Sequence, residues 1–176
     1  TQRIENDGEG ITGLFFACND IDAYVAGART HVPSIESRLG RGEDASGHER
    51  RWRSAHIMTE QNCGNFHAAI QHETDSNVLP AARAVVEGYV AGLAEIHVSS
   101  ADLEATRTLY EEIMRLDRLS DRRYRVGGTE IIVEDDKGGF HRDRIHTLIF
   151  DVENKRSFLS RIEAPTRLCG VDVAIR

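Results

Sequence analysis

Cysteine is scarce in this sequence. The three that are present, Cys18, Cys63 and Cys169, are widely spaced, and no two form a C-x-x-C pair. An odd and scattered set does not predict a disulfide framework, so we expect a protein of the reducing cytoplasm with buried or incidental thiols. A catalytic cysteine stays open, because exposure and pKa decide whether a thiol reacts and the sequence shows neither.

Long apolar runs and an excess of positive charge are also missing. No stretch approaches the roughly 18 residues that a membrane-spanning helix needs, and the opening TQRIENDGEG lacks the basic and then apolar order of a signal peptide. The net charge of −7 disfavours nonspecific attraction to nucleic acid or anionic lipid. Arginines cluster in HERRWR and DRRYR, but nearby acids offset them, which favours solvated strand edges over a polyanion site. We therefore expect no nucleic-acid partner and no membrane partner.

The motifs of several large enzyme classes do not occur. The sequence contains no G-x-S-x-G, no P-loop, no G-x-G-x-x-G after a strand and no H-x-x-x-H pair on a helix. Each of these motifs places specific groups for a specific chemistry. We therefore expect no nucleophilic hydrolase, nucleotide-binding or zincin-type function.

One local pattern is present three times. Each copy opens with about six residues of strand character and then an Asp or Asn at a helix N-cap position, namely Asp20, Asp102 and Asn154. Apolar residues at helical spacing follow, so each helix has a single apolar side to bury against a sheet. The copies are GLFFACNDIDAYVAGARTH, GLAEIHVSSADLEATRTLYEEIM and HTLIFDVENKRSFLSRI.

Strand-like segments follow each predicted helix. They are ERRWRSAHI and NFHAAIQHE after the first, DRRYRVGG and TEIIVED after the second, and LCGVDVAIR after the third. Internal repetition on this scale favours modules that pair to bury a shared sheet. We predict an α+β fold of paired βαβββ modules, with curved mixed sheets and helices on their outer face.

The repeats suggest a division of the chain. We expect a first module over residues 1–78, a linker over residues 79–91 and a second module over residues 92–176, which holds two repeats with the last one cut short. A Gly-, Ser- and charge-rich segment, PSIESRLGRGEDASGHE, is predicted to form a long loop inside the first module.

These segments resemble a known superfamily. SSADLEATRTLYEEIM closely resembles the strand-to-helix step of the vicinal oxygen chelate proteins, also called the glyoxalase/bleomycin-resistance/dioxygenase fold. CNDIDAYVAGART and DVENKRSFLSRI resemble it more loosely, and SGHERRWRSA and FHAAIQH resemble the strands of a glyoxalase-like group. The resemblance also implies a further unit ahead of Gly10. In that case the chain is a fragment whose first module lacks its partner half.

The resemblance implies a divalent metal held by side chains on inward strand faces, with open positions for two substrate oxygens. The family's first-strand ligand lies seven residues before the capping Asp, which gives Glu95 here. His97 shares the face of Glu95, because side chains alternate along a strand. Gln71 completes the predicted ligand set. The alternative is a partly solvated sheet face with no ligand, since the corresponding positions of the other two copies offer only Gly13 and Thr147.

Other polar strand residues are candidates for substrate binding. His67 shares one face of FHAAIQH with Gln71, and His72 lies on the other face. Glu134 of TEIIVED can supply a further carboxylate. Alternation predicts that His146 lies on the face opposite to Thr147, so it is not expected to join Glu95.

The function implied by the resemblance is that of a glyoxalase-like protein that acts on a small oxygenated metabolite. The chemistry implied is metal-assisted lyase or isomerase chemistry, or ring cleavage by a dioxygenase, with one Mn, Fe, Ni or Zn ion and with Glu95 or another carboxylate moving the proton. Two alternatives remain, because one fold hosts many chemistries. One is a metal-free binding protein of the resistance type, against which the low aromatic content of 6% argues mildly. The other is a dimerising domain without catalysis. A homodimer is expected, and pairing of modules within one chain or across the dimer stays open.

Overall fold

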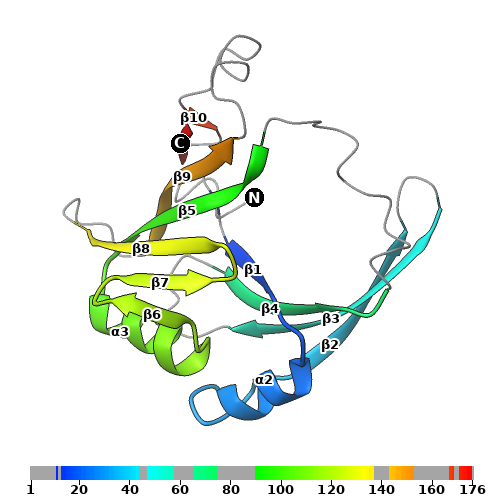
Figure 1. The fold of residues 1–176 in the computed structure, drawn as a ribbon. Coiled ribbons are helices and arrows are strands. Elements are labelled where there is room, and N and C mark those ends of the chain that lie inside the picture. The colour runs from blue at the N-terminus through cyan, green and yellow to red at the C-terminus, as the bar shows by residue number, and fades with distance from the viewer. Residues whose placement is uncertain are drawn as a thin grey trace, which may run out of the picture.

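The computed structural model describes residues 11, 13–43, 47–57, 66–74, 90–136, 143–152, 167–168 and 171–175 (Figure 1). Strands in this part of the chain form one sheet of four strands and one of seven, both curved. The helix predicted after Asn154 lies outside the described residues, as do residues 79–89 of the predicted linker. None of the described helices is long and apolar enough to cross a membrane.

The four-stranded sheet comes from the N-terminal part of the chain. Its elements are β1 (Gly13–Ala17), α2 (Ile21–Ala28), β2 (Ser37–Glu43), β3 (Glu49–Ile57) and β4 (Phe66–His72). The strands lie in the order β1-β4-β3-β2, with β1 parallel to β4 and the other neighbours antiparallel. α2 begins where the sequence predicts it, because the Asp20 carboxylate accepts hydrogen bonds from the N–H groups of Asp22 and Ala23.

The seven-stranded sheet repeats this topology. Its elements are β5 (Val90–Ser100), α3 (Leu103–Thr108), η3 (Leu109–Ile113), β6 (Asp117–Ser120), β7 (Arg123–Val126), β8 (Thr129–Asp135), β9 (Arg144–Val152), β10 (Arg167–Leu168) and β11 (Val171–Ile175). The strand order is β10-β11-β9-β5-β8-β7-β6, so β5 to β8 have the arrangement of β1 to β4. β9 opens the third copy and pairs in parallel with β11. The second and third copies join through the antiparallel pair β5 and β9. The predicted α+β fold of βαβββ modules is confirmed.

The helix after β5 changes its winding halfway along. Asp102 caps α3 by accepting from the N–H groups of Glu104 and Ala105. The helix then continues as the π-helical turn η3, in which the Met114 N–H donates to the Leu109 carbonyl at 2.8 Å. Leu109, Tyr110 and Ile113 of this turn are buried.

Tyr110 stands at the contact between the two sheets. Its ring stacks on His67 of β4 with centroids 5.8 Å apart and meets Tyr124 of β7 edge-on at 5.3 Å. The Arg115 guanidinium lies over Gly27 of α2, 2.7 Å from where a Cβ would stand, so the segment after η3 is close to α2. The helix-facing sides of both sheets therefore share a hydrophobic core.

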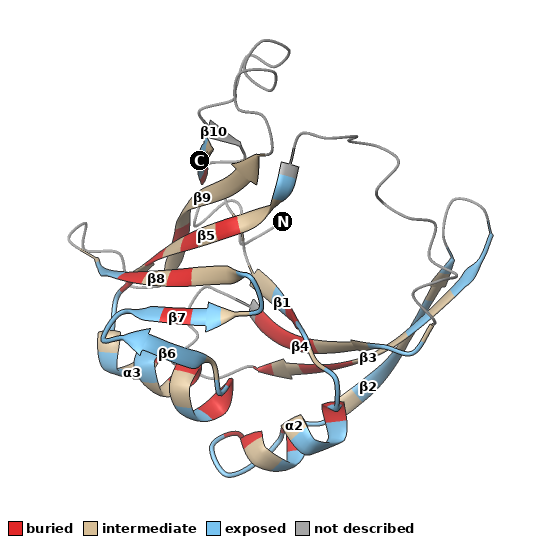
Figure 2. Ribbon diagram, viewed as in Figure 1, coloured by how far each residue is buried: buried red, intermediate tan, exposed pale blue. Residues whose placement is uncertain are grey.

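The two faces of the seven-stranded sheet differ in burial. Along β5 the residues Ala94, Ile96 and Val98 are buried against the core, and more exposed residues alternate with them (Figure 2). The residues between them, Glu95 and His97, lie on the side turned away from α3 and η3. We call this side the far face. It also carries Glu130, Ile132 and Glu134 of β8, and Arg123 and Arg125 of β7, which are aligned with β5 by the strand register.

Candidate functional site

Two carboxylates and an imidazole lie together on the far face. His97 Nε2 is 3.1 Å from Glu95 Oε2, and His97 Nδ1 is 3.0 Å from Glu134 Oε1. The side chains of Glu95 and His97 are only 18% and 19% exposed, whereas that of Glu134 is half exposed. Parallel pairing of β5 and β8 places Glu134 opposite Ser99, one step along the far face from His97. Three of the residues predicted from the sequence are therefore in direct contact.

The hydrogen bonds of this cluster link its two carboxylates through the imidazole of His97. An ionised carboxylate only accepts hydrogen bonds, and a neutral imidazole has one donor nitrogen and one acceptor nitrogen. Which nitrogen of His97 donates therefore depends on the tautomer of the ring. The three groups form a carboxylate–imidazole–carboxylate relay, an arrangement of side chains suited to acid–base chemistry.

His146 extends the cluster, contrary to the expectation from strict alternation. Its Nε2 is 3.7 Å from Glu134 Oε2, and its ring meets His97 edge-on with centroids 6.0 Å apart. The reason is a β-bulge: His97 pairs with Thr147 and Val98 with Ile145, so His146 is an extra residue on β9. Bulges turn a side chain away from its alternating position. The sequence prediction for His146 was therefore wrong.

The environment of His146 keeps its ring neutral. Burial lowers the pKa of His146, and nearby His97 lowers it further, whereas Glu134 opposes the shift. Its Nδ1 is 2.9 Å from the Thr147 hydroxyl, and its Nε2 is buried with no hydrogen-bond partner in the described part of the chain. The His146 ring thus lies beside the relay, with Nδ1 on the Thr147 hydroxyl and Nε2 nearest to Glu134.

The other predicted residues lie elsewhere. Gln71 is in the four-stranded sheet, where its side-chain oxygen accepts the N–H of Ile21 at 2.9 Å and supports the start of α2. His67 is 2% exposed in the core beside Tyr110, 3.5 Å from that hydroxyl. His72 is exposed at the end of β4, across from Trp52. The structure does not bring these three side chains to the Glu95 cluster, because β4 belongs to the other sheet.

The side chains of Glu95, His97, Glu134 and His146 are the potential metal ligands on the far face. Two carboxylates and two imidazoles are donors that Mn, Fe, Ni and Zn accept in proteins. In the part of the chain that the structure describes, however, no group of three His, Cys, Asp or Glu side chains is placed to hold one ion. The two ring nitrogens of His97 are engaged with carboxylates instead. In this arrangement the residues do not fit a metal centre.

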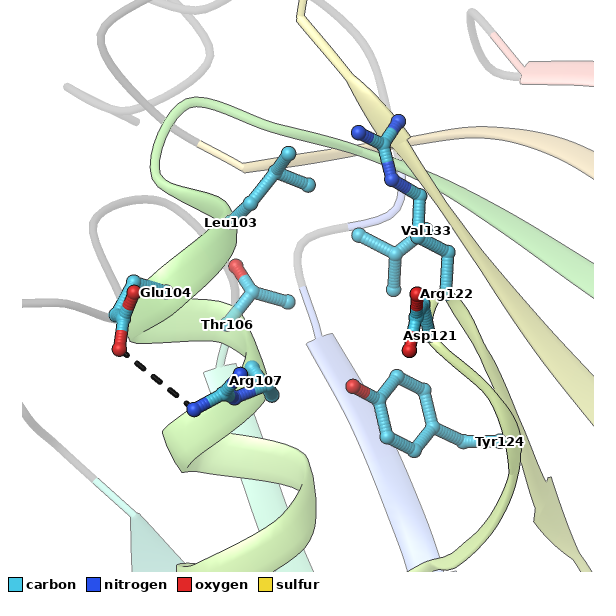
Figure 3. Close-up of a pocket in the computed structure, with 8 residues that line it drawn as sticks. All are labelled: Leu103, Glu104, Thr106, Arg107, Asp121, Arg122, Tyr124 and Val133. Atoms are coloured by element: carbon cyan, nitrogen blue, oxygen red, sulfur yellow. Dashed lines mark ion pairs between the residues drawn. The ribbon is translucent and has the colours of Figure 1, made fainter.

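A separate hollow of about 170 Å³ opens between α3 and the β6–β7 turn (Figure 3). It lies on the helix side of the sheet, because Tyr124 and Val133 in its wall are core residues. Two acids and two arginines among its lining residues balance in charge, and Arg107 pairs with Glu104 at 3.6 Å. The lining residues are Leu103, Glu104, Thr106, Arg107, Asp121, Arg122, Tyr124 and Val133. This hollow is distinct from the far face.

Comparison with known proteins agrees with this architecture. A family model described as a glyoxalase-like domain matches residues 1–114 of the 176. The chain belongs to the glyoxalase-like domain family. With it, the chain belongs to the vicinal oxygen chelate superfamily, as the sequence resemblance predicts. A search of curated proteins finds no match.

Two solved structures show how far the likeness of this glyoxalase-like chain extends. The crystal structure of a hypothetical protein from Staphylococcus aureus aligns with 100% of this chain and 70% of its own, at 14% identity and a TM-score of 0.69. That likeness shows the fold alone. The Mn(II)-bound glyoxalase from Novosphingobium aromaticivorans aligns with 80% of this chain and 46% of its own, at 10% identity. The TM-score of this second alignment is only 0.45.

Proposed function

We propose that this protein is a glyoxalase-like isomerase or lyase that moves a proton next to a carbonyl group of a small oxygenated metabolite. The observation that carries the proposal is the pair of hydrogen bonds from His97 to Glu95 and Glu134 on the far face. Membership of the glyoxalase-like family supports the reaction class. A homodimer and a small-molecule substrate, both expected from the sequence, belong to the same proposal.

The roles follow from position and chemistry. Glu95 is the more buried carboxylate, and it removes the proton from carbon. The electron pair of the C–H bond then forms the carbon–carbon double bond of an enediolate, while the π pair of the carbonyl group moves onto its oxygen. His97 holds the Glu95 carboxylate in place through Nε2. Glu134 orients the ring from the other side and lies at the more exposed end of the relay. The proton on Glu95 exchanges with solvent through the relay, and in an isomerase a proton is then delivered from Glu95 to the adjacent carbon. In a lyase the electron pair of the enediolate instead expels a leaving group from the neighbouring carbon, and this group takes up the proton.

Hydrogen exchange next to the carbonyl group tests the proposal on several compounds and does not depend on the choice of one substrate. Small 2-hydroxyaldehydes, 2-hydroxyketones and thiol adducts of 2-oxoaldehydes are incubated with the protein in D₂O, and ¹H NMR follows deuterium entry beside the carbonyl. Wild type is expected to exchange at least one compound, and Glu95→Gln is expected to lower the rate about 10²–10⁴-fold, the usual contribution of a positioned acid–base group. Glu104→Gln, on the exposed surface of α3, is the matched control and is expected to leave the rate unchanged.

Treatment with a chelator separates this proposal from a metal-assisted one. Because the relay works with the protein's own groups, exchange is expected to survive removal of divalent ions by EDTA. Loss of exchange that one equivalent of Mn, Fe, Ni or Zn restores would contradict the relay as written and would favour metal assistance. Equal exchange by wild type and Glu95→Gln would refute the role of Glu95 under either chemistry.

A further inference from the structure

Two arginines on β7 face the same side of the sheet as the relay. Tyr124, between them, is 1% exposed and points into the core, so Arg123 and Arg125 project from the far face. Arg125 is the register partner of Glu130, which in turn is the partner of Glu95. Arg123 is aligned in the same way, through Ile132, with His97. Each arginine thus lies two strands away from one member of the relay, at the matching position in the strand register.

Among the described residues, the neighbouring acids do not saturate these arginines. Arg123 Nη1 lies 3.4 Å and Arg125 Nη2 lies 3.7 Å from the two oxygens of Glu130. Both distances exceed the usual hydrogen-bond range, so the contacts are ion pairs rather than the bidentate bonds that guanidinium forms with an oxyanion. Asp117 faces Arg125 from β6 in the strand register. Both guanidinium side chains remain 49% exposed, which leaves N–H donors available for a ligand.

The reach of the pair defines where an anion would bind. Neighbouring strands are about 4.8 Å apart, so the backbone of β7 lies roughly 10 Å from that of β5. The arginine side chains lean back across β8 to Glu130, which shortens the gap to Glu95. An anionic group held there would place a carbonyl a few bonds away within reach of the relay. Arginine is suited to this role, because its planar fork matches carboxylate and phosphate oxygens.

We infer that Arg123 and Arg125 form the subsite for an anionic group, and that the substrate is a small carbonyl compound with a carboxylate or phosphate at its far end. The inference rests on the proposed function for the position of the reacting carbon. It adds the substrate class, and it names two specificity-determining residues in a segment whose charge pattern by itself indicates only a solvated strand edge.

The first experiment uses simple anions as probes. Glutarate and inorganic phosphate are titrated into ¹⁵N-labelled protein, and NMR follows the arginine Nε–Hε signals, assigned by their loss in Arg123→Gln and Arg125→Gln. Saturable shifts of these two signals are expected, and the preferred probe distinguishes carboxylate from phosphate. Uncharged glutaramide is the matched control ligand and is expected to give no shift. Absence of saturable shifts with both anions would overturn the inference.

Variants test the same subsite from two directions. The double variant R123Q/R125Q is expected to bind the preferred anion about a hundredfold more weakly, since each of the two lost charge-assisted hydrogen bonds is typically worth a factor of about ten. Glu130→Gln removes the competing carboxylate and is expected to tighten binding, an outcome that misfolding does not produce. Arg41→Gln, on exposed β2 of the other sheet, is the control and is expected to bind as wild type does. Equal binding by R123Q/R125Q and wild type would overturn the subsite.

Exchange assays keep this inference separate from the proposed function. Glu95→Gln is expected to bind the anion normally while losing proton exchange. For a compound that exchanges, R123Q/R125Q is expected to raise KM more than it lowers kcat. Arginine-dependent anion binding without any exchange in wild type would overturn the proton-transfer function and leave the anion site standing. Exchange that is unaffected in R123Q/R125Q would overturn the subsite and leave the proton-transfer function standing.

Discussion

Asp143 links the start of β9 to the start of α3 through hydrogen bonds. Replacing it by Ala should lower the stability of the fold, whereas replacing it by Asn should not. One carboxylate oxygen accepts the Thr106 hydroxyl at 2.8 Å, and the other accepts the Ala101 N–H at 3.1 Å. Thr106 is buried and also lies 2.6 Å from the Ser100 hydroxyl. Burial raises the pKa of Asp143 above its ordinary value of 3.8, although these hydrogen bonds oppose the shift. Compared with water, the site therefore shifts the balance toward the neutral carboxyl group.

The magnitude follows from what each substitution leaves unsatisfied. Asp143→Ala removes the hydrogen bonds from Thr106 and Ala101, each worth about 0.5–1.5 kcal/mol, but Thr106 keeps Ser100 and the exposed Ala101 N–H turns to water. We therefore expect a loss of about 1–2 kcal/mol, which lowers Tm by roughly 2–8 °C in a chain of this length. Asp143→Asn keeps an acceptor for Ala101 and adds a donor toward Thr106, so it should match or exceed wild type at pH 7.

The pH dependence gives the sharper test. Because the folded pKa of Asp143 is raised, its stabilising contribution is fully present below the unfolded value of 3.8 and is lost as pH rises through the folded pKa. The uncharged Asn does not titrate, so its advantage over wild type should be largest at pH 7 and should shrink as pH falls toward 4. Circular dichroism melts at pH 7 and pH 4.5 measure both effects. The reasoning is refuted if Asp143→Asn is as unstable as Asp143→Ala at pH 7, or if the difference between Asn and wild type does not change with pH.

Two further substitutions test the cluster and the core. Burial lowers the pKa of His146, so its contribution to stability is present above the unfolded value of 6.5 and is lost as pH falls through the folded pKa. Urea unfolding at pH 7 and pH 5 should therefore show a smaller drop in the free energy of unfolding for His146→Gln than for wild type. An equal drop in the two proteins would contradict the environment assigned to His146. Tyr110→Ala should cost about 3–5 kcal/mol, as for other large aromatic truncations, whereas Tyr110→Phe should cost about 1 kcal/mol or less because the contact of the hydroxyl with His67 is a long 3.5 Å. Similar urea midpoints for the two Tyr110 variants would show that the ring does not carry the contact between the sheets.

Some parts of the candidate site were accessible from the sequence and others were not. Glu95 and His97 share a face because alternation within one strand is a local property. The contact with Glu134 needed the parallel register of β5 and β8, which residue patterns alone do not specify. His146 was missed because a bulge in β9 changes its direction. The available signal was the adjacent pair of polar residues, His146 and Thr147, between the apolar residues Ile145 and Leu148.

The sequence by itself determined where strands turn into helices. Asp20 and Asp102 cap their helices as predicted, because an N-cap acts only on the backbone within the next three residues. The tertiary structure alone decided which side chains meet. Packing of the two sheets placed His67 in the core, and strand pairing assembled the relay, since contacts between residues distant in the chain depend on register and packing rather than on local residue preferences.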